Sequence, residues 1–123
     1  VVQNRLYADT NYDRDIRQFC REKNIYYQSF WTLTGKSFSL VKDIGSLANI
    51  FITANPHILG YPLVQQLAQE RHATPAQIFF RFLLDVGLTP LTGTTSDKHM
   101  KEDLQILHWP SLDHQSVARL KKL

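Results

Sequence analysis

The sequence predicts an α/β protein with a parallel sheet, because three short apolar stretches alternate with helical patterns along the chain. The second stretch, residues 25–35, is a near-continuous apolar and aromatic run that becomes polar only at its C-terminal end. Such a run is typical of a parallel strand that is covered on both faces. Ligand-binding residues of parallel α/β sheets cluster where the strands end, so we expect a functional site after Phe30 and at the equivalent ends of the other strands.

The first third of the chain has the pattern of a strand, a helix and a second strand. Residues 1–5 form the expected first strand, and no turn or cap precedes it, which indicates that the sequence is part of something larger. A turn and capping cluster at residues 9–13 precedes apolar residues at helical spacing, and we expect this helix to stop at Asn24. Cys20 falls on the expected buried side of the helix, which favours an inert packed thiol over a nucleophile.

The second half carries clear helix start signals. Pro62 suits the first position of one helix, and Thr74 followed by proline suits the cap of the next. Ser96 can cap a third helix, and Ser111 or Asp113 can cap the last one. The expected elements are helices 63–71 and 75–86, strand 88–91, loop 92–96, and helices 97–107 and 113–123.

Size and composition limit the protein to one modest domain, residues 1–123. The net charge of +3 is mild, and the basic residues form no cluster with aromatic residues, so we expect neither nucleic acid nor a membrane as a partner. The chain has no apolar run of membrane-spanning length and no signal peptide, so we expect a cytoplasmic protein. The five histidines lack the spacing of a metal site, and we assign no catalytic and no metal-binding residue.

The strongest candidate for chemistry is the small-residue loop at residues 93–96, which precedes an amphipathic helix. Unpaired backbone N–H groups and the helix dipole both favour an anion at such a place, although many short turns have this composition for steric reasons alone. Gln3 and Asn4 could hydrogen-bond a carboxamide or a sugar, or could serve as caps. Phe30 and Trp31 offer a flat surface for stacking on a ring, although core packing is the commoner fate of such residues.

Four motifs in order resemble the C-terminal part of the aldo-keto reductases, a family with an (α/β)₈ barrel that reduces carbonyl compounds with NADPH. They are Val-Gln-Asn-Arg at 2–5, Tyr-Tyr-Gln-Ser-Phe-Trp-Thr-Leu-Thr at 26–34, Thr-Pro-Ala-Gln at 74–77, and Pro-Leu-Thr-Gly-Thr-Thr-Ser at 90–96 with His99, Glu102 and Asp103. The resemblance implies a partial (β/α)₈ TIM barrel that holds strands 6 to 8 with their helices and a C-terminal helix.

The resemblance also implies a cofactor site. Gln3 would hydrogen-bond the nicotinamide carboxamide, Phe30 would stack on the nicotinamide ring, and Trp31 and Leu33 would lie beside the pyrophosphate. The remaining implied residues, at the adenosine 2′-phosphate and the adenine, are Gly93, Thr94, Thr95, His99, Glu102 and Asp103. A small carbonyl compound would be the substrate of the full-length protein.

Three positions depart from the family pattern. Gly93 stands where many members have lysine, His99 where they have arginine, and Asp103 where they have asparagine. The charge that would hold a 2′-phosphate is missing, and Asp103 would repel it, so NADH is retained as an alternative to NADPH. The family's catalytic tyrosine, lysine, aspartate and histidine belong to the first half of the barrel, so we expect the isolated chain to be inactive.

Residues 35–53 interrupt the family pattern. Removing them joins Thr34 to Ala54-Asn55-Pro56, the loop that the pattern leads us to expect there. Our hypothesis is a retained intron, and the alternative is a variable loop over the active site.

Two functions are therefore predicted, from different classes. The first is the cofactor-binding part of an aldo-keto reductase. The alternative is a non-catalytic half-barrel, binding or regulatory, that acts by self-association through exposed barrel edges or through a partner.

Overall fold

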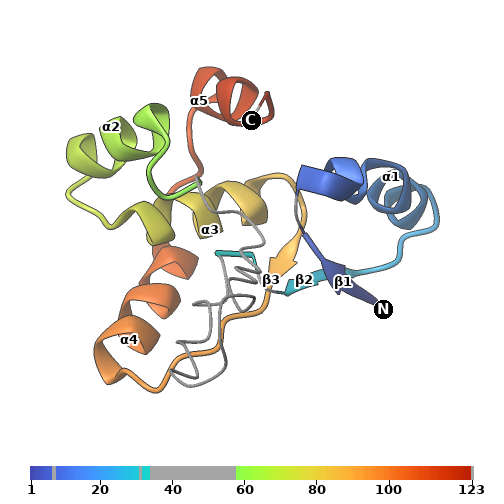
Figure 1. The fold of residues 1–123 in the computed structure, drawn as a ribbon, viewed down its shortest axis with the longest axis horizontal. Helices are drawn as coiled ribbons and strands as arrows, with labels where there is room; N and C mark the ends of the chain where they lie inside the picture. The colour runs from blue at the N-terminus through green and yellow to red at the C-terminus, as the bar shows by residue number, and fades with distance from the viewer. Residues whose placement is uncertain (7, 31, 34–57, 123) are drawn as a thin grey trace, which may run out of the picture.

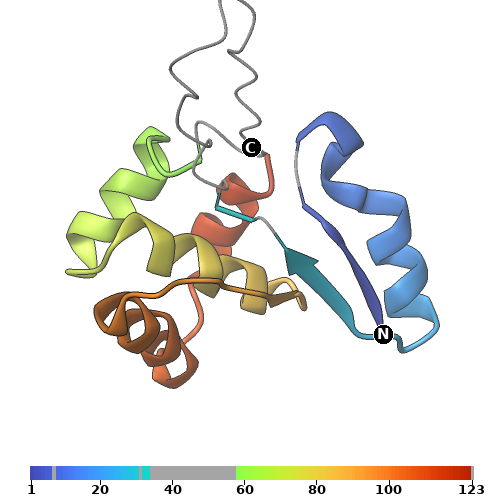
Figure 2. The ribbon, with the colours of Figure 1, turned by 60° about the horizontal axis from the view of Figure 1, so that its bottom comes forward.

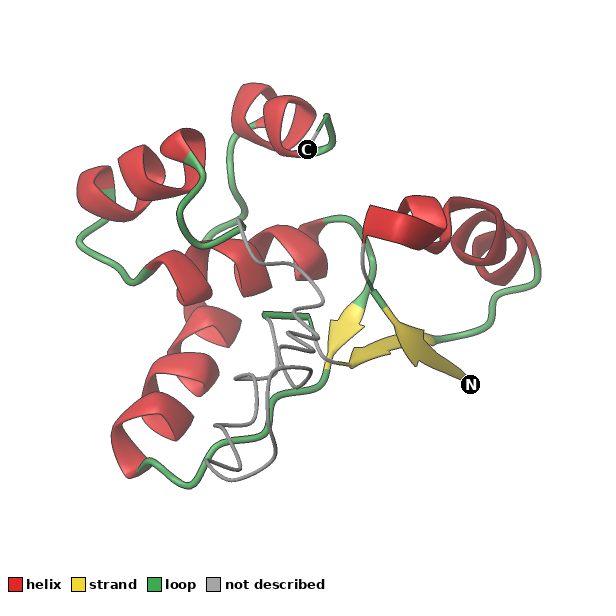
Figure 3. Ribbon diagram, in the orientation of Figure 1, coloured by secondary structure: helices red, strands yellow, loops and turns green. Residues whose placement is uncertain are grey.

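A computed structural model describes residues 1–6, 8–30, 32–33 and 58–122 (Figure 1). Within these residues the chain forms a parallel sheet of three strands in the order β1-β2-β3, together with helices (Figure 3). The predicted α/β class with a parallel sheet is confirmed. The hypothesis of an inserted segment falls on residues 35–53, which lie outside the described residues.

The strands are short and in register. β1 (Val2–Arg5) pairs with β2 (Tyr27–Phe30), which places Gln3 beside Gln28 and Arg5 beside Phe30. β2 pairs in turn with β3 (Thr89–Pro90). Because all three strands are parallel, their carboxyl ends lie at one edge of the sheet.

The helices begin at the predicted signals. α1 (Arg14–Glu22) follows a 3₁₀ segment, η1 (Ala8–Asp13), and α2 (Pro62–Glu70) begins at its proline. α3 (Pro75–Asp85) has a full capping box, in which the Thr74 hydroxyl accepts from the Gln77 N–H and the Gln77 side chain accepts from the Thr74 N–H. The remaining helices are α4 (Asp97–Gln105), η2 (Ile106–His108) and α5 (His114–Leu120), with Ser96 and Asp113 as caps of α4 and α5.

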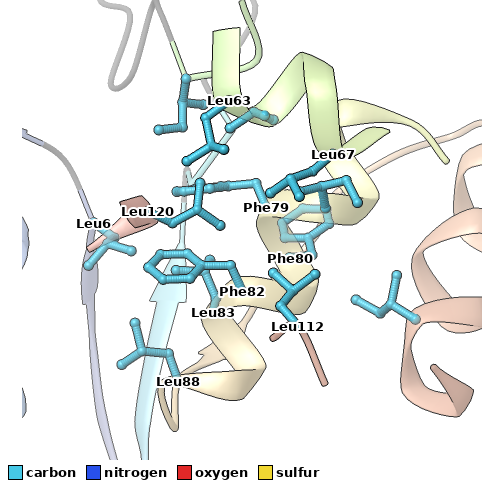
Figure 4. Packing of buried hydrophobic residues seen from close by; sticks show 14 of the residues in the cluster. Leu6, Leu63, Leu67, Phe79, Phe80, Phe82, Leu83, Leu88, Leu112 and Leu120 are labelled. Atoms are coloured by element: carbon cyan, nitrogen blue, oxygen red, sulfur yellow. The ribbon is translucent and has the colours of Figure 1, made fainter. Parts of the chain in front are cut away.

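The core is built around α3. This helix lies in the centre of the fold with α2, α4 and α5 around it (Figure 1). Its residues Ile78, Phe79, Phe82 and Leu83 are buried, and leucines from the neighbouring segments pack on them (Figure 4). α1 lies apart from this group, beside β1 and β2 (Figure 2). None of the helices that the structure describes is long and apolar enough to cross a membrane.

Two expectations from the sequence are wrong. Among the described residues of the strand expected at 25–35, which are 25–30, 32 and 33, only residues 27–30 are strand. Tyr27 and Ser29 are buried, while Gln28 and Phe30 are half-buried. Within the described residues, only the face of β2 that carries Tyr27 and Ser29 is fully covered. The near-continuous apolar run did not indicate that the two faces of this strand are covered unequally.

The second wrong expectation concerns α1, whose apolar side was expected to be buried. Cys20 is buried as expected, but Ile16 is 41% exposed and Phe19 is 52% exposed. Helical spacing identifies residues that share a side of a helix, and it does not identify what covers that side.

Buried polar contacts fix α1 to the sheet. The Asp13 carboxylate at the start of α1 accepts hydrogen bonds from the Asn4 side-chain amide (2.6 Å) and from the Tyr27 hydroxyl (2.7 Å). Burial raises the pKa of Tyr27, and the hydrogen bond to Asp13 raises it further, because ionisation would place two anions side by side.

A second polar cluster joins α3 to the C-terminal segment. Arg81 donates to the Asp85 carboxylate at 2.5 Å, and the Leu112 N–H donates to the same carboxylate at 2.8 Å. Burial alone would raise the pKa of Asp85, but these hydrogen bonds outweigh it and hold that pKa below its ordinary value.

Candidate functional site

The carboxyl ends of β1, β2 and β3 lie at one edge of the sheet. Phe30 ends β2 there, whereas Gln3 is the second residue of β1 and lies before that edge. Adjacent strands lie about 5 Å apart, so the three ends fall within about 10 Å of one another. The hydrogen bond from the Leu91 N–H to the Ser29 carbonyl (2.7 Å) continues the pairing past β3 and ties its following loop to the end of β2.

Gln3 and Phe30 lie on the same face of the sheet. Side chains alternate along a strand, so Gln3 and Arg5 share one face of β1, and Phe30 stands beside Arg5 in the register. The opposite face carries the buried Ser29. Gln3 is exposed and Phe30 is half-buried, so both have surface that a ligand could contact.

The predicted residues that follow β2 are only partly described. Leu33 is half-buried and packs against the edge of the core. Trp31, predicted to lie beside a pyrophosphate, is outside the described residues.

The loop after β3 is organised by its hydroxyl groups. The Thr94 hydroxyl accepts a hydrogen bond from the Ser96 N–H at 3.1 Å, and the Ser96 hydroxyl accepts one from the His99 N–H at 3.4 Å. These two bonds hold the loop in a turn that leads directly into α4. Small hydroxyl residues therefore shape the loop, as short turns require.

Two backbone donors remain at the start of α4. The N–H groups of Asp97 and Lys98 have no acceptor among the residues that the structure describes. Such groups, together with the positive end of the helix dipole, favour a bound anion. The Asp97 side chain already supplies negative charge in the first turn, so an anion there would have to approach away from this carboxylate.

A groove of about 520 Å³ lies beside this loop. Three of the predicted cofactor residues line it, namely Gly93, Thr94 and Asp103. The rest of the lining is mostly apolar and comes from α3, β3, α4 and η2: Phe80, Leu84, Thr89, Pro90, Leu91, Thr92, Met100, Leu104, Ile106 and Leu107. Asp103 is the one charged side chain among these lining residues, and it is half-buried.

The other predicted residues of this region lie around the groove without lining it. Thr95 and His99 are exposed at the start of α4. Glu102 is half-buried, and its carboxylate lies 3.8 Å from the Lys98 ammonium. The groove therefore brings together Gly93, Thr94 and Asp103 of the predicted cofactor residues. The other three residues of this region lie outside its lining.

Gln77 positions α4 and was predicted only as part of a motif. Its side-chain amide donates to the Glu102 carbonyl at 2.8 Å and to the Gln105 side chain at 3.2 Å. The side chain is 4% exposed, so these hydrogen bonds lie inside the protein. The Thr-x-x-Gln capping box indicated one partner of Gln77 in the sequence, but the contact with a helix 25 residues away has no local signal.

The site offers binding chemistry. A flat aromatic side chain, an exposed amide and unpaired N–H groups suit a ligand with a ring, a carboxamide and an anionic group. Among the described residues no group of three or more His, Cys, Asp or Glu side chains could hold a metal ion.

Comparison with known proteins agrees with this arrangement. No protein-family model matches the chain. The chain is 29% identical over 96 residues to "Protein REDOX 2" of Catharanthus roseus, with 78% of this chain and 26% of the relative covered. It is 25% identical over 108 residues to "Aldo-keto reductase family 4 member C11" of Arabidopsis thaliana, with 88% of this chain and 30% of the relative covered. It is 32% identical over 69 residues to "Prostaglandin-E(2) 9-reductase" of Oryctolagus cuniculus, with 54% of this chain and 21% of the relative covered.

Solved structures share the fold over nearly the whole chain. A mutant of Gox0644 in complex with NADPH has a TM-score of 0.71 at 22% identity, and an aldo/keto reductase from Brucella melitensis has a TM-score of 0.67 at 15% identity. Each comparison covers 98% of this chain but only 36% and 37% of the solved chains. The chain thus spans about a third of these structures and 21–30% of the curated relatives.

Proposed function

We propose that this chain, which resembles the aldo-keto reductases in sequence and has the fold of part of their barrel, forms the cofactor-binding part of an NADPH-dependent oxidoreductase. The observation that carries the proposal is that Gln3 of β1 and Phe30 at the end of β2 share one face of the sheet. The loop after β3 is hydrogen-bonded to the end of β2 beside Phe30.

Gln3 and Phe30 would hold the nicotinamide end. An exposed amide can exchange hydrogen bonds with a carboxamide, and a half-buried aromatic ring on the same face can stack on a flat heterocycle. The predicted neighbours Trp31 and Leu33 would lie next to the pyrophosphate. NADPH, or NADH in its place, supplies hydride chemistry when bound.

The loop after β3 would hold the adenosine end. The Asp97 and Lys98 N–H groups can donate hydrogen bonds to an anion, and Gly93, Thr94 and Asp103 line an apolar groove suited to a flat base. Thr95, His99 and Glu102 would complete the rim. Asp103 places negative charge in that groove and would repel a 2′-phosphate, so NADH is kept as the alternative to NADPH.

Carbonyl reduction would also need a proton donor, and we assign none among the residues that the structure describes. Tyr27 is the most buried tyrosine among them, but its hydroxyl already donates to Asp13, and its pKa is raised. A general acid needs a pKa near the working pH, so Tyr27 is unsuited to the task. We therefore propose that residues 1–123 bind the cofactor without reducing a carbonyl compound by themselves. Reduction of a small aldehyde or ketone is proposed for the whole protein.

Calorimetric titration of the chain with NADPH and NADH tests the proposal. We expect saturable binding of one dinucleotide per chain. Gln3→Leu should weaken that binding by roughly 3- to 10-fold, because it removes one hydrogen-bonding group of the nicotinamide end. Gln69→Leu is the matched control, since Gln69 is exposed on α2, and it should leave binding unchanged. A folded chain that binds neither dinucleotide would refute the proposal.

A second candidate function, a non-catalytic half-barrel that self-associates, is favoured by exposed apolar side chains on two different helical segments. Leu104 and Leu107 are 62% and 59% exposed beside the groove at β3, and Phe19 on α1 is 52% exposed. Exposed apolar groups at separate places suit contacts between copies. Sedimentation over a range of concentrations separates the two functions. A chain that stays monomeric and binds the dinucleotide would exclude the self-associating half-barrel.

A further inference from the structure

A second groove, of about 490 Å³, opens between α1 and the α3–α5 group. Its lining comes mainly from η1, α1, α3 and α5, and it shares no lining residue with the groove beside β3. The ribbon places α1 on one side of it and α3 with α5 on the other (Figure 1). The volume falls within the usual range of small-molecule sites.

The floor of this groove is apolar. Phe79, Phe82 and Leu83 of α3 form one part of it, and Leu120 of α5 and Leu6, which follows β1, form another (Figure 4). All five side chains are at most 8% exposed. A ligand that reaches this floor would therefore meet hydrocarbon, which favours an apolar group of matching length.

The rim is strongly cationic. Arg14, Arg17 and Arg21 fall at i, i+3 and i+7 on α1, so they share one side of the helix, and Lys121 faces the groove from the end of α5. No aspartate or glutamate is among the lining residues that the structure describes. The four cations thus meet at a groove with no carboxylate of its own.

The arginines of α1 are not neutralised by ion pairs in the described part of the chain. Arg17 is half-buried, and its Nε donates to the Tyr12 carbonyl at 2.6 Å. Burial lowers the pKa of Arg17, and the charges of Arg21 and Arg14 lower it further, while Tyr27 and Asp13 oppose the change. A bound anion would relieve this crowding of like charges.

We propose that the groove between α1 and the α3–α5 group binds an anionic amphiphile, a small molecule with a carboxylate head and an aliphatic body. The head contacts Arg17 and Arg21, and the body lies on Phe79, Phe82 and Leu120. A purely inorganic anion would leave the apolar floor uncovered, and a neutral hydrocarbon would leave the cations unpaired. The proposal does not depend on the dinucleotide site.

Calorimetric titration of the chain with decanoate, kept below its micelle concentration, tests this proposal. We expect saturable binding of one decanoate per chain. Butyrate should bind at least about 10-fold more weakly, because it buries fewer methylene groups. Decanol should also bind about 10-fold more weakly, and decyltrimethylammonium should not bind, because each lacks the charge that the rim attracts.

Charge-removing variants test the rim. The double variant Arg17→Gln with Arg21→Gln should lose about 10-fold in decanoate affinity. Arg14→Gln, at an exposed position, should lose several-fold in decanoate affinity while keeping the fold. Arg119→Gln is the matched control, since Arg119 is exposed on α5 outside the groove, and it should bind as the unmodified chain does.

Three results would overturn the proposal. One is decanoate binding that equals decanol binding or that does not saturate. Another is a folded Arg14→Gln variant and a folded double variant that both keep full affinity. The third is a dimer, detected by sedimentation, that decanoate does not dissociate, because a second copy would then be the occupant of the groove.

Discussion

Replacing Gln77 by leucine should loosen α4 from α3 and destabilise the protein. The side chain takes part in three hydrogen bonds: it accepts one from the Thr74 N–H (3.0 Å) and donates to the Glu102 carbonyl and the Gln105 side chain (2.8 and 3.2 Å). Leucine has a similar volume and no polar atom, so the change isolates the polar contacts from the packing.

The magnitude follows from the burial of these contacts. Each net hydrogen bond contributes about 0.5–1.5 kcal/mol, and a buried group left without a partner costs more than an exposed one. Three such contacts at a site that is 4% exposed predict a loss of about 2–4 kcal/mol in the free energy of unfolding. A loss of that size is a large part of the stability of a small domain.

Urea denaturation followed by circular dichroism measures the effect. Gln66→Leu is the matched control, because Gln66 is exposed on α2 and makes one hydrogen bond, to Glu70 at 2.7 Å. This control should change the free energy of unfolding by less than about 0.5 kcal/mol. A Gln77→Leu loss below about 1 kcal/mol would refute the view that Gln77 anchors α4.

Three further predictions concern the cofactor groove, the response to acid and the segment 35–53. Asp103→Asn should strengthen NADPH binding several-fold relative to NADH, because it removes the negative charge that lines the groove; unchanged relative affinities in paired titrations would contradict this. Asp85 has a lowered pKa in the folded protein, so its contribution to stability is present above its ordinary pKa, near 4, and is lost as the pH falls through the lower folded value. Asp85→Asn should therefore flatten the acid limb of the stability curve, and an unaltered limb measured by denaturation would count against that role. Sequencing of the messenger RNA across the Thr34–Ala54 junction should yield transcripts that lack codons 35–53, and transcripts that always carry those codons would reject the retained intron.

Local signals in the sequence were enough to predict the helix starts and the order of strands. Thr74, Ser96 and Asp113 each cap the helix expected of them, since a cap depends on residues within one turn. The parallel sheet followed from the alternation of apolar and helical patterns. Strand length was overestimated at residues 25–35, because an apolar run gives no information about where backbone pairing ends.

The candidate site depended more on resemblance than on local pattern. Gln3 and Phe30 share a face because side chains alternate along each strand, and this follows from the register once the strand pairing is known. The groove beside β3 could not be predicted, because it forms where α3 and α4 diverge and Leu104 and Met100 come to line it. The groove at α1 was missed for the same reason, although the i, i+3, i+7 spacing of its arginines was visible in the sequence.

The proposed dinucleotide site is tested most directly by recording backbone amide NMR shifts of the chain during a titration with NADPH. We predict that the shifts concentrate at two places: Gln3 and Phe30 on one face of the sheet, and the 93–99 segment at the start of α4. Shifts confined to α1 and α5, or none at saturating NADPH in a folded sample, would contradict it.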